Sequence, residues 1–285
     1  MKLVIGGAQF GLDYGVSNKT GKINPDEAEC ILSTSKKNGI DTIDAAVAYG
    51  DCEEALGKIG LSGWRVGSKV PPGVEGKDSV VRYVHQSLQK LKVDTLDYCL
   101  VHLDSDLLGP NGKSIAGGMM QVKNDGLAKK IGYAIYNPDR LTRLIEVLPP
   151  DIIQTPLNVF DHRIVTTGWL EKLVQSRVEV HARSLFLQGM LLLSPDQRAK
   201  YGFNKSINLW KTWDSLVGGS MEKALSLCLG FAKAHPALSK VVIGVENCRN
   251  LEQLINLWGQ AVPFDANQLS CNDLLLLEPQ NWKKI

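Results

Sequence analysis

The chain has 285 residues, of which 44% are hydrophobic, and its 32 basic and 30 acidic side chains leave a formal net charge of +2. This near balance gives no electrostatic reason to expect nucleic acid or an anionic membrane as a partner. No segment reaches the roughly 18 consecutive apolar residues of a membrane span, and the apolar stretch after Met1 is too short for a signal peptide.

Short apolar runs alternate with longer amphipathic stretches from the N-terminus onward. Residues 3–6 are the first predicted strand. The next segment has the signals of a helix start, because Asn24 can act as the N-cap and Pro25 sits where its missing N–H is not needed. Glu27 is spaced to complete a capping box with Asn24, and Gly39 marks the end of this helix.

The same strand-then-helix unit recurs along the chain. Further strands are predicted, in chain order, at 42–45, 65–69, 96–103, 129–134, 152–154, 178–183 and 241–244. Helices are predicted at 53–59, after Asp78 as a cap, at 139–147, and after the last strand, where Leu251 and Trp258 share one face.

About eight such units without a linker predict an α/β fold, a (β/α)8 TIM barrel that forms a single domain over residues 1–285. The rival fold, an open doubly wound sheet, would place a helix directly after its glycine-rich turn. The glycine-rich segment at 6–11 is followed by Leu12 and Asp13 without a helix signal, which argues against that rival.

Residues 192–219 do not fit the repeat. We expect them to form a long excursion after the seventh strand, over the active face of the barrel. Its aromatic residues Phe203, Trp210 and Trp213 either line the substrate pocket or pin the excursion to the barrel.

Polar side chains of four different types stand at the ends of successive predicted strands. Asp44 ends the second strand and Tyr49 follows it, Lys69 ends the third, and His102 ends the fourth. Barrel active sites lie at the C-terminal ends of the strands, so these side chains should meet at one mouth. Each alone has an ordinary structural interpretation, such as packing or helix capping, but the four together indicate a catalytic site.

These four residue types suit the reduction of a carbonyl group. Hydride arriving at carbon leaves an alkoxide that needs a proton, and Tyr49 can supply that proton as a general acid. The ammonium of Lys69, kept protonated by Asp44, is expected to lower the pKa of the Tyr49 phenol. His102 can donate a hydrogen bond to the carbonyl oxygen.

With these motifs in place, the chain resembles the aldo-keto reductase family. The segments that carry the likeness follow one another in the family's order over nearly the whole chain, at 43–50, 67–69, 96–102, 130–134, 153–158 and 242–244. The resemblance implies a catalytic tetrad of Asp44, Tyr49, Lys69 and His102, with Tyr49 as proton donor. It also implies NADP(H), with NAD(H) as the alternative, and a small-molecule carbonyl substrate, either an aldehyde, a ketone or a sugar-derived compound.

The resemblance also indicates which residues hold the cofactor. Gln154 matches a glutamine that grips the nicotinamide carboxamide, and residues 184–189 match the loop around the pyrophosphate. The helix start after the eighth strand would receive the adenosine 2′-phosphate. The predicted cofactor-binding residues are Gly7, Ala8, Gln9, Asp44, Gln154, Arg183, Ser184, Leu185, Leu187, Gln188, Gly189, Gly244, Asn247, Asn250 and Gln253.

The chain departs from the family pattern in places that concern the cofactor. Ala134 and Ile135 stand where the family has a Ser-Asn pair, and Arg183 stands where an aromatic often stacks on the nicotinamide. A guanidinium can also stack, but it adds positive charge beside a ring that is cationic when oxidised. Only Arg249 supplies a basic group near the expected 2′-phosphate position, which weakens the case for NADPH over NADH.

The six cysteines are scattered, and their spacing fits neither a zinc site nor a disulfide framework. We therefore expect no metal and a reducing, cytoplasmic location. Two other functions stay open, namely a Schiff-base lyase with Lys69 as nucleophile and a non-catalytic nicotinamide-nucleotide-binding subunit. The sequence does not predict an oligomeric state.

Overall fold

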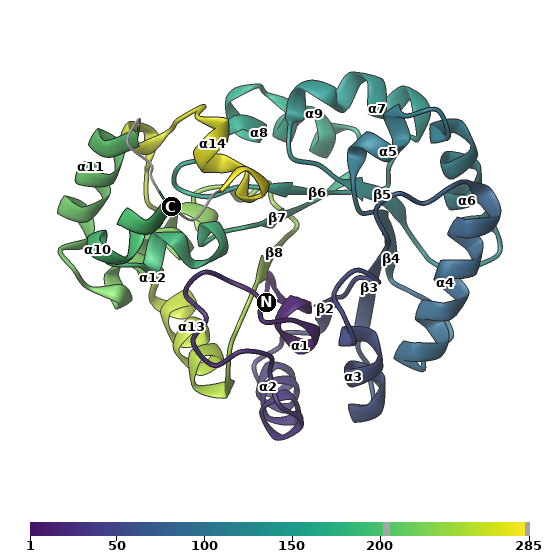
Figure 1. The fold of residues 1–285 in the computed structure, drawn as a ribbon, viewed down its shortest axis with the longest axis horizontal. Helices are drawn as coiled ribbons and strands as arrows, with labels where there is room; N and C mark the ends of the chain where they lie inside the picture. The colour runs from purple at the N-terminus through teal and green to yellow at the C-terminus, as the bar shows by residue number, and fades with distance from the viewer. Residues whose placement is uncertain (202–205, 283–285) are drawn as a thin grey trace.

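The computed structural model describes residues 1–201 and 206–282, and the described residues form a closed barrel of parallel strands surrounded by helices (Figure 1). Each strand pairs with the next one, and the last pairs with the first. The predicted (β/α)8 barrel is confirmed, and each predicted strand overlaps an observed one. The strands are β1 (Leu3–Gly6), β2 (Thr42–Asp44), β3 (Arg65–Val70), β4 (Tyr98–Val101), β5 (Ile131–Ala134), β6 (Ile152–Pro156), β7 (Glu179–Arg183) and β8 (Lys240–Ile243).

Helices follow the strands and cover the outside of the barrel (Figure 1). They are α1 (Ala8–Gly11), α2 (Pro25–Lys37), α3 (Cys52–Ile59), α4 (Lys77–Leu91), α5 (Asp104–Leu108), α6 (Gly112–Asn124), α7 (Leu141–Val147), α8 (Arg163–Thr166), α9 (Trp169–Gln175), α10 (Pro195–Arg198), α11 (Ile207–Val217), α12 (Met221–Lys233), α13 (Cys248–Gln260) and α14 (Leu274–Leu277).

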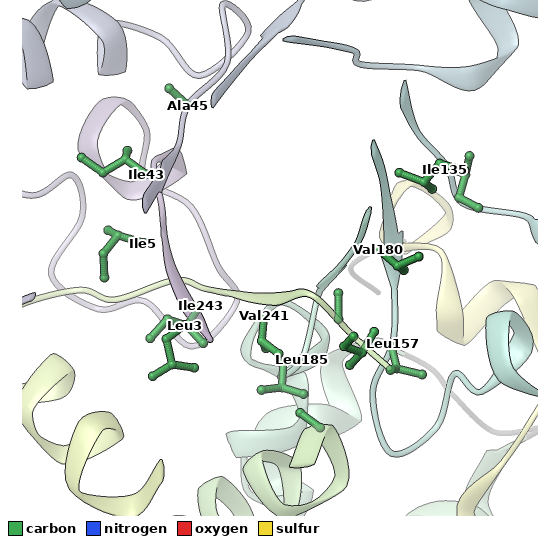
Figure 2. Close-up of a cluster of buried hydrophobic side chains, with 14 of the residues drawn as sticks. Leu3, Ile5, Ile43, Ala45, Ile135, Leu157, Val180, Leu185, Val241 and Ile243 are labelled. Atoms are coloured by element: carbon green, nitrogen blue, oxygen red, sulfur yellow. The ribbon is translucent and has the colours of Figure 1, made fainter. Parts of the chain in front are cut away.

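Alternate residues of the strands face opposite sides of the barrel wall. One set packs between the sheet and the helices, where Figure 2 shows buried side chains from several strands, among them Ile5, Ile43, Val180 and Val241. The other set faces the barrel interior, where Tyr98, Leu100 and Ile152 form a cluster of their own. The polar residues at the C-terminal strand ends continue this inward set.

Two local predictions about helix starts differ from the structure, and one short helix was not predicted. Asn24 accepts a hydrogen bond from the backbone N–H of Glu27, which confirms the N-cap of α2. The capping box is wrong, because the Glu27 carboxylate accepts instead from the backbone N–H of Cys248, at 2.7 Å. Asp78 lies within the first turn of α4 and is not its cap, since Gly76 holds that position. The one-turn helix α1 after β1 was not predicted either.

A disulfide joins Cys30 on α2 to Cys248 at the start of α13, across 218 residues of sequence. The expectation that the scattered cysteines form no disulfide is therefore wrong for this pair. Closure of the barrel explains the pairing, because it brings β8 against β1 and so sets α13 beside α2 (Figure 1). The spacing of the cysteines along the chain therefore gives no indication of this contact.

The predicted excursion after β7 contains α10 and α11 and packs onto the barrel. Trp213 is buried and donates its ring N–H to the backbone carbonyl of Leu191, and Phe160 lies edge-on to both Trp210 and Trp213. These two tryptophans therefore pin the excursion and do not line the cavity described below, while Phe203 lies outside the described residues. In the described part of the chain, no helix has the length and apolar run needed to cross a membrane.

Candidate active site

A cavity of about 780 Å³ opens at the C-terminal ends of the strands. Its size falls within the range of small-molecule and cofactor sites. All four predicted catalytic residues line it, and it extends from them to the N-terminal end of α13. The structure thus brings the predicted residues into one continuous cavity.

Asp44 and Lys69 form a buried ion pair at the base of this cavity. Lys69 Nζ donates to Asp44 Oδ2 at 2.6 Å and to the backbone carbonyl of Ala45 at 3.0 Å. Both side chains are almost inaccessible, with 1% of Lys69 and 3% of Asp44 exposed. Charges this deep persist only with partners, so each residue depends on the other.

The Asp44 carboxylate is held by more than its ion pair. Tyr98 donates its hydroxyl to Asp44 Oδ1 at 2.8 Å, and Gln154 Nε2 donates to the same oxygen at 2.9 Å. Burial acts to raise the pKa of Asp44, but the attraction of Lys69 and these hydrogen bonds outweigh it, and the pKa is lowered. Gln154, predicted to grip the nicotinamide, thus has a structural role at Asp44 as well.

Tyr98 is a site residue that was not predicted from the sequence, because its neighbours made the strand look uniformly apolar. Its ring crosses the interior beside Gly67, where an added Cβ would lie 2.0 Å from the ring atoms. The register pairs Gly67 with Tyr98. A tyrosine opposite a glycine on the inward face was the available signal.

The proposed proton donor, Tyr49, is half-buried at the cavity wall. Lys69 Nζ lies 5.0 Å from the centroid of its ring, and the His102 ring meets it edge-on with centroids 5.6 Å apart. Burial and the negative charge of Asp44 raise the pKa of Tyr49 above its usual value. The expected lowering of this pKa by Lys69 is therefore wrong for the protein alone. A firmly protonated phenol suits the donor role in reduction.

His102 is neutral in this environment. Burial, followed by the positive charges of Lys69 and Arg183, lowers the pKa of His102 to about 4. Its Nδ1 atom is buried and has no hydrogen-bond partner among the described residues. A neutral imidazole carries one N–H and one bare nitrogen, so it can still donate a single hydrogen bond to a carbonyl oxygen.

Nearly all the predicted cofactor residues line the cavity. Leu187 is the exception, because its side chain is fully buried away from it. Those that line the cavity are Gly7, Ala8, Gln9, Asp44, Gln154, Arg183, Ser184, Leu185, Gln188, Gly189, Gly244, Asn247, Asn250 and Gln253.

The segment between α1 and α2 also lines the cavity, which was not predicted from the sequence. Tyr14, Ser17, Lys19 and Thr20 face the cavity. The segment is fastened to the loop after β7, since the backbone N–H of Val16 donates to the carbonyl of Gln188 at 2.9 Å. A Cβ on Gly189, whose φ is +91°, would lie 2.1 Å from Ser17 Oγ, so only glycine fits there. Contact between such distant segments leaves no local sequence signal.

Arg183 takes part in a network that includes two positions where the chain departs from the family pattern. Its guanidinium lies 4.1 Å from the centroid of the Tyr136 ring and donates to the Ile135 carbonyl at 3.0 Å and to Ser184 Oγ at 3.2 Å. The Ile135 side chain is buried, and Ala134 lines the cavity. The backbone of residue 135 therefore positions Arg183.

The cavity fits a nicotinamide nucleotide. It runs from the four predicted catalytic residues to the N-terminal end of α13, so it includes both the expected nicotinamide site and the helix start expected to receive the adenosine phosphate. The Arg183 Nε and His102 Nδ1 atoms are buried in its walls without partners among the described residues. Such unpartnered polar atoms are typical of a site that a ligand completes.

Comparison with known proteins supports the same family. The chain matches the aldo/keto reductase family over residues 2–274 and belongs to it. Members of this family are NAD(P)H-dependent oxidoreductases, and NADP(H) is the nucleotide they use. An aldo-keto reductase of Mycobacterium sp. strain MCS is 30% identical over 135 residues, which are 45% of this chain and 46% of the relative. The chain thus aligns with about half the length of the curated relatives it matches.

Solved structures share the fold. The holo form of an aldo-keto reductase from Bacillus halodurans superposes with a TM-score of 0.73 at 18% identity, covering 94% of this chain and 89% of that one. A variant of the protein Gox0644 in complex with NADPH gives a TM-score of 0.67 at 16% identity, covering 95% and 90%. At these identities the likeness establishes the fold alone.

Proposed function

We propose that this protein transfers hydride between a nicotinamide nucleotide and the carbonyl carbon of a small molecule, with Tyr49 as the proton donor. The observation that carries the proposal is the buried Asp44–Lys69 pair beside Tyr49 and His102, in a cavity that extends to the N-terminal end of α13. The Gox0644 structure with NADPH has the same fold and supports the choice of cofactor class.

The chain's own residues hold and protonate the substrate oxygen. When bound, the nicotinamide would supply the hydride. Neutral His102 donates a hydrogen bond to the carbonyl oxygen, and Tyr49 gives that oxygen its proton as negative charge develops. The ammonium of Lys69, held by Asp44, stabilises the phenolate that Tyr49 becomes. Gln154 donates a hydrogen bond to Asp44, which fixes the position of the carboxylate that holds Lys69.

The Schiff-base alternative is disfavoured by the position of Lys69. A nucleophilic lysine must reach its substrate as a neutral amine. Lys69 is 1% exposed and its Nζ donates hydrogen bonds to Asp44 and Ala45, so it is not free to attack a substrate. Absence of borohydride trapping at Lys69 with aldehydes is the expected result.

The proposal is tested by Tyr49→Phe with Tyr83→Phe, on the outer helix α4, as matched control. Nucleotide binding, followed by fluorescence, should be retained in both. Turnover of an aldehyde panel should fall by about 10²–10⁴-fold in Tyr49→Phe only, the usual contribution of a general acid. Nucleotide binding without turnover in the unaltered protein would instead support a non-catalytic nucleotide-binding subunit.

Two features of the proposal rest on the sequence. The proposed substrate class is a small aldehyde, ketone or sugar-derived carbonyl, and the proposed location is the cytoplasm. The Cys30–Cys248 disulfide is an observation against the second of these, because disulfides are rare in reducing compartments.

A further inference from the structure

The far end of the cavity, at the N-terminal end of α13, is where the adenosine half of the nucleotide would lie if the nicotinamide is at the tetrad. This region is lined by Glu246, Asn247 and Asn250 together with Lys19 and Thr20 from the segment before α2. A smaller cavity of about 390 Å³ adjoins it and shares Thr20, Glu246 and Asn247. A 2′-phosphate on the adenosine ribose would have to fit in this corner.

The helix start in this corner is already partly occupied by groups of the protein. Free N–H groups at a helix N-terminus ordinarily attract a phosphate. In α13, the N–H of Cys248 donates to the Glu27 carboxylate at 2.7 Å, and the N–H of Asn250 donates to the Asn247 side chain at 2.9 Å. A carboxylate from α2 therefore stands where a phosphate would otherwise bind.

A second carboxylate lies at the junction of the two cavities. Glu246 lines both cavities, and Ser17 and Lys19 line the larger one with it. Burial raises the pKa of the Glu246 carboxyl. A carboxylate has about four lone-pair sites, so Glu246 can accept a hydrogen bond from a ribose hydroxyl. It would repel a phosphate at the same place.

The cations of this corner do not outweigh the carboxylates. Lys22 is paired with Asp51 at 2.8 Å. Lys19 and Arg249 line the same two cavities as Glu27 and Glu246, so these four side chains carry no net positive charge to hold a phosphate dianion. In nucleotide sites generally, an acidic side chain on the ribose 2′-hydroxyl favours NAD and an arginine there favours NADP.

We propose that Glu246, assisted by Glu27, makes this chain select NAD(H) over NADP(H), in contrast to the usual nucleotide of its family. The proposal rests on the proposed function, because it assumes that the cavity holds a nicotinamide nucleotide. Glu246 acts by accepting from the ribose hydroxyls and by repelling a 2′-phosphate. Glu27 acts by occupying the first N–H of α13.

The test is a fluorescence titration of the full chain with NADH and with NADPH, which needs no turnover. NADH should bind at least about tenfold more tightly, which is the scale of a single charge–charge interaction in a binding site. Glu246→Gln keeps the size of the side chain and one acceptor oxygen but loses the charge. It should reduce the preference at least about fivefold, mainly by strengthening NADPH binding. The double variant Glu246→Gln with Glu27→Gln should reduce the preference for NADH further.

Glu29→Gln, an exposed position on α2 outside both cavities, is the matched control and should leave the preference unchanged. Equal or tighter binding of NADPH by the unaltered protein would overturn this proposal and leave the proposed function standing. The same holds if Glu246→Gln leaves the preference unchanged. Tighter NADPH binding that is lost in Arg249→Met would identify a phosphate clamp instead. Binding of neither nucleotide would overturn the proposed function, and this proposal with it.

Discussion

Replacement of Asp44 by asparagine should destabilise the protein far more than the same change at a surface ion pair. The Asp44 carboxylate accepts from Lys69 at 2.6 Å, Tyr98 at 2.8 Å and Gln154 at 2.9 Å. Asparagine has the same shape but one oxygen. If that oxygen serves Tyr98 and Gln154, the amide N–H₂ faces the Lys69 ammonium, donor against donor.

The magnitude follows from burial. Lys69 is 1% exposed, so the variant leaves a cation in the interior without its counter-ion. Removing one partner of a buried ion pair costs about 3–5 kcal/mol. The double variant Asp44→Asn with Lys69→Met removes both charges. It should therefore recover a large part of that loss, with a coupling energy of about 2–3 kcal/mol.

The assay is urea unfolding followed by tryptophan fluorescence and by circular dichroism. Asp51→Asn is the control, because Asp51 and Lys22 are separated by 2.8 Å but are 50% and 44% exposed. An exposed pair contributes about 0–1 kcal/mol, so the control midpoint should barely move. Equal midpoints for Asp44→Asn and Asp51→Asn would refute the reasoning, as would strictly additive single variants.

The sign of the pH dependence gives a second check on Asp44. Its pKa is lowered in the folded protein, so its contribution to stability is full above the unfolded value of about 3.9 and is lost as pH falls through the folded value. In Asp44→Asn, this part of the loss in the free energy of unfolding at acid pH should be missing.

Three further predictions concern other features. Because the pKa of His102 is lowered to about 4, the pH profile of kcat/KM should show no break near 6.5, and such a break, abolished by His102→Gln, would contradict a neutral imidazole. Gly67→Ala should cost at least about 1–3 kcal/mol because its Cβ would meet the Tyr98 ring, whereas Gly117→Ala, with open space around it, should be neutral or stabilising; equal effects would refute the close contact. Reduction of the Cys30–Cys248 disulfide, or Cys30→Ser, should lower the free energy of unfolding by about 2–4 kcal/mol in a denaturant titration, and an unchanged midpoint would show that the bond does not stabilise the fold.

The sequence alone was sufficient to predict the barrel and to place four candidate catalytic residues at its mouth. Each strand is a short apolar run that ends in a residue with different chemistry, so Asp44, Lys69 and His102 could be placed at strand ends from local pattern alone. Parallel strands in a barrel present those ends on one face, and the meeting of these side chains then follows from the fold class.

Only the tertiary structure decided which groups surround that tetrad. Barrel closure sets α13 beside α2, and it thereby creates the Cys30–Cys248 disulfide and places Glu27 on the first N–H of α13. Burial also reversed the expected direction of the Tyr49 pKa, because desolvation depends on everything packed around the phenol rather than on one neighbouring ammonium. Such contacts join residues far apart in the chain, so no local pattern contains them.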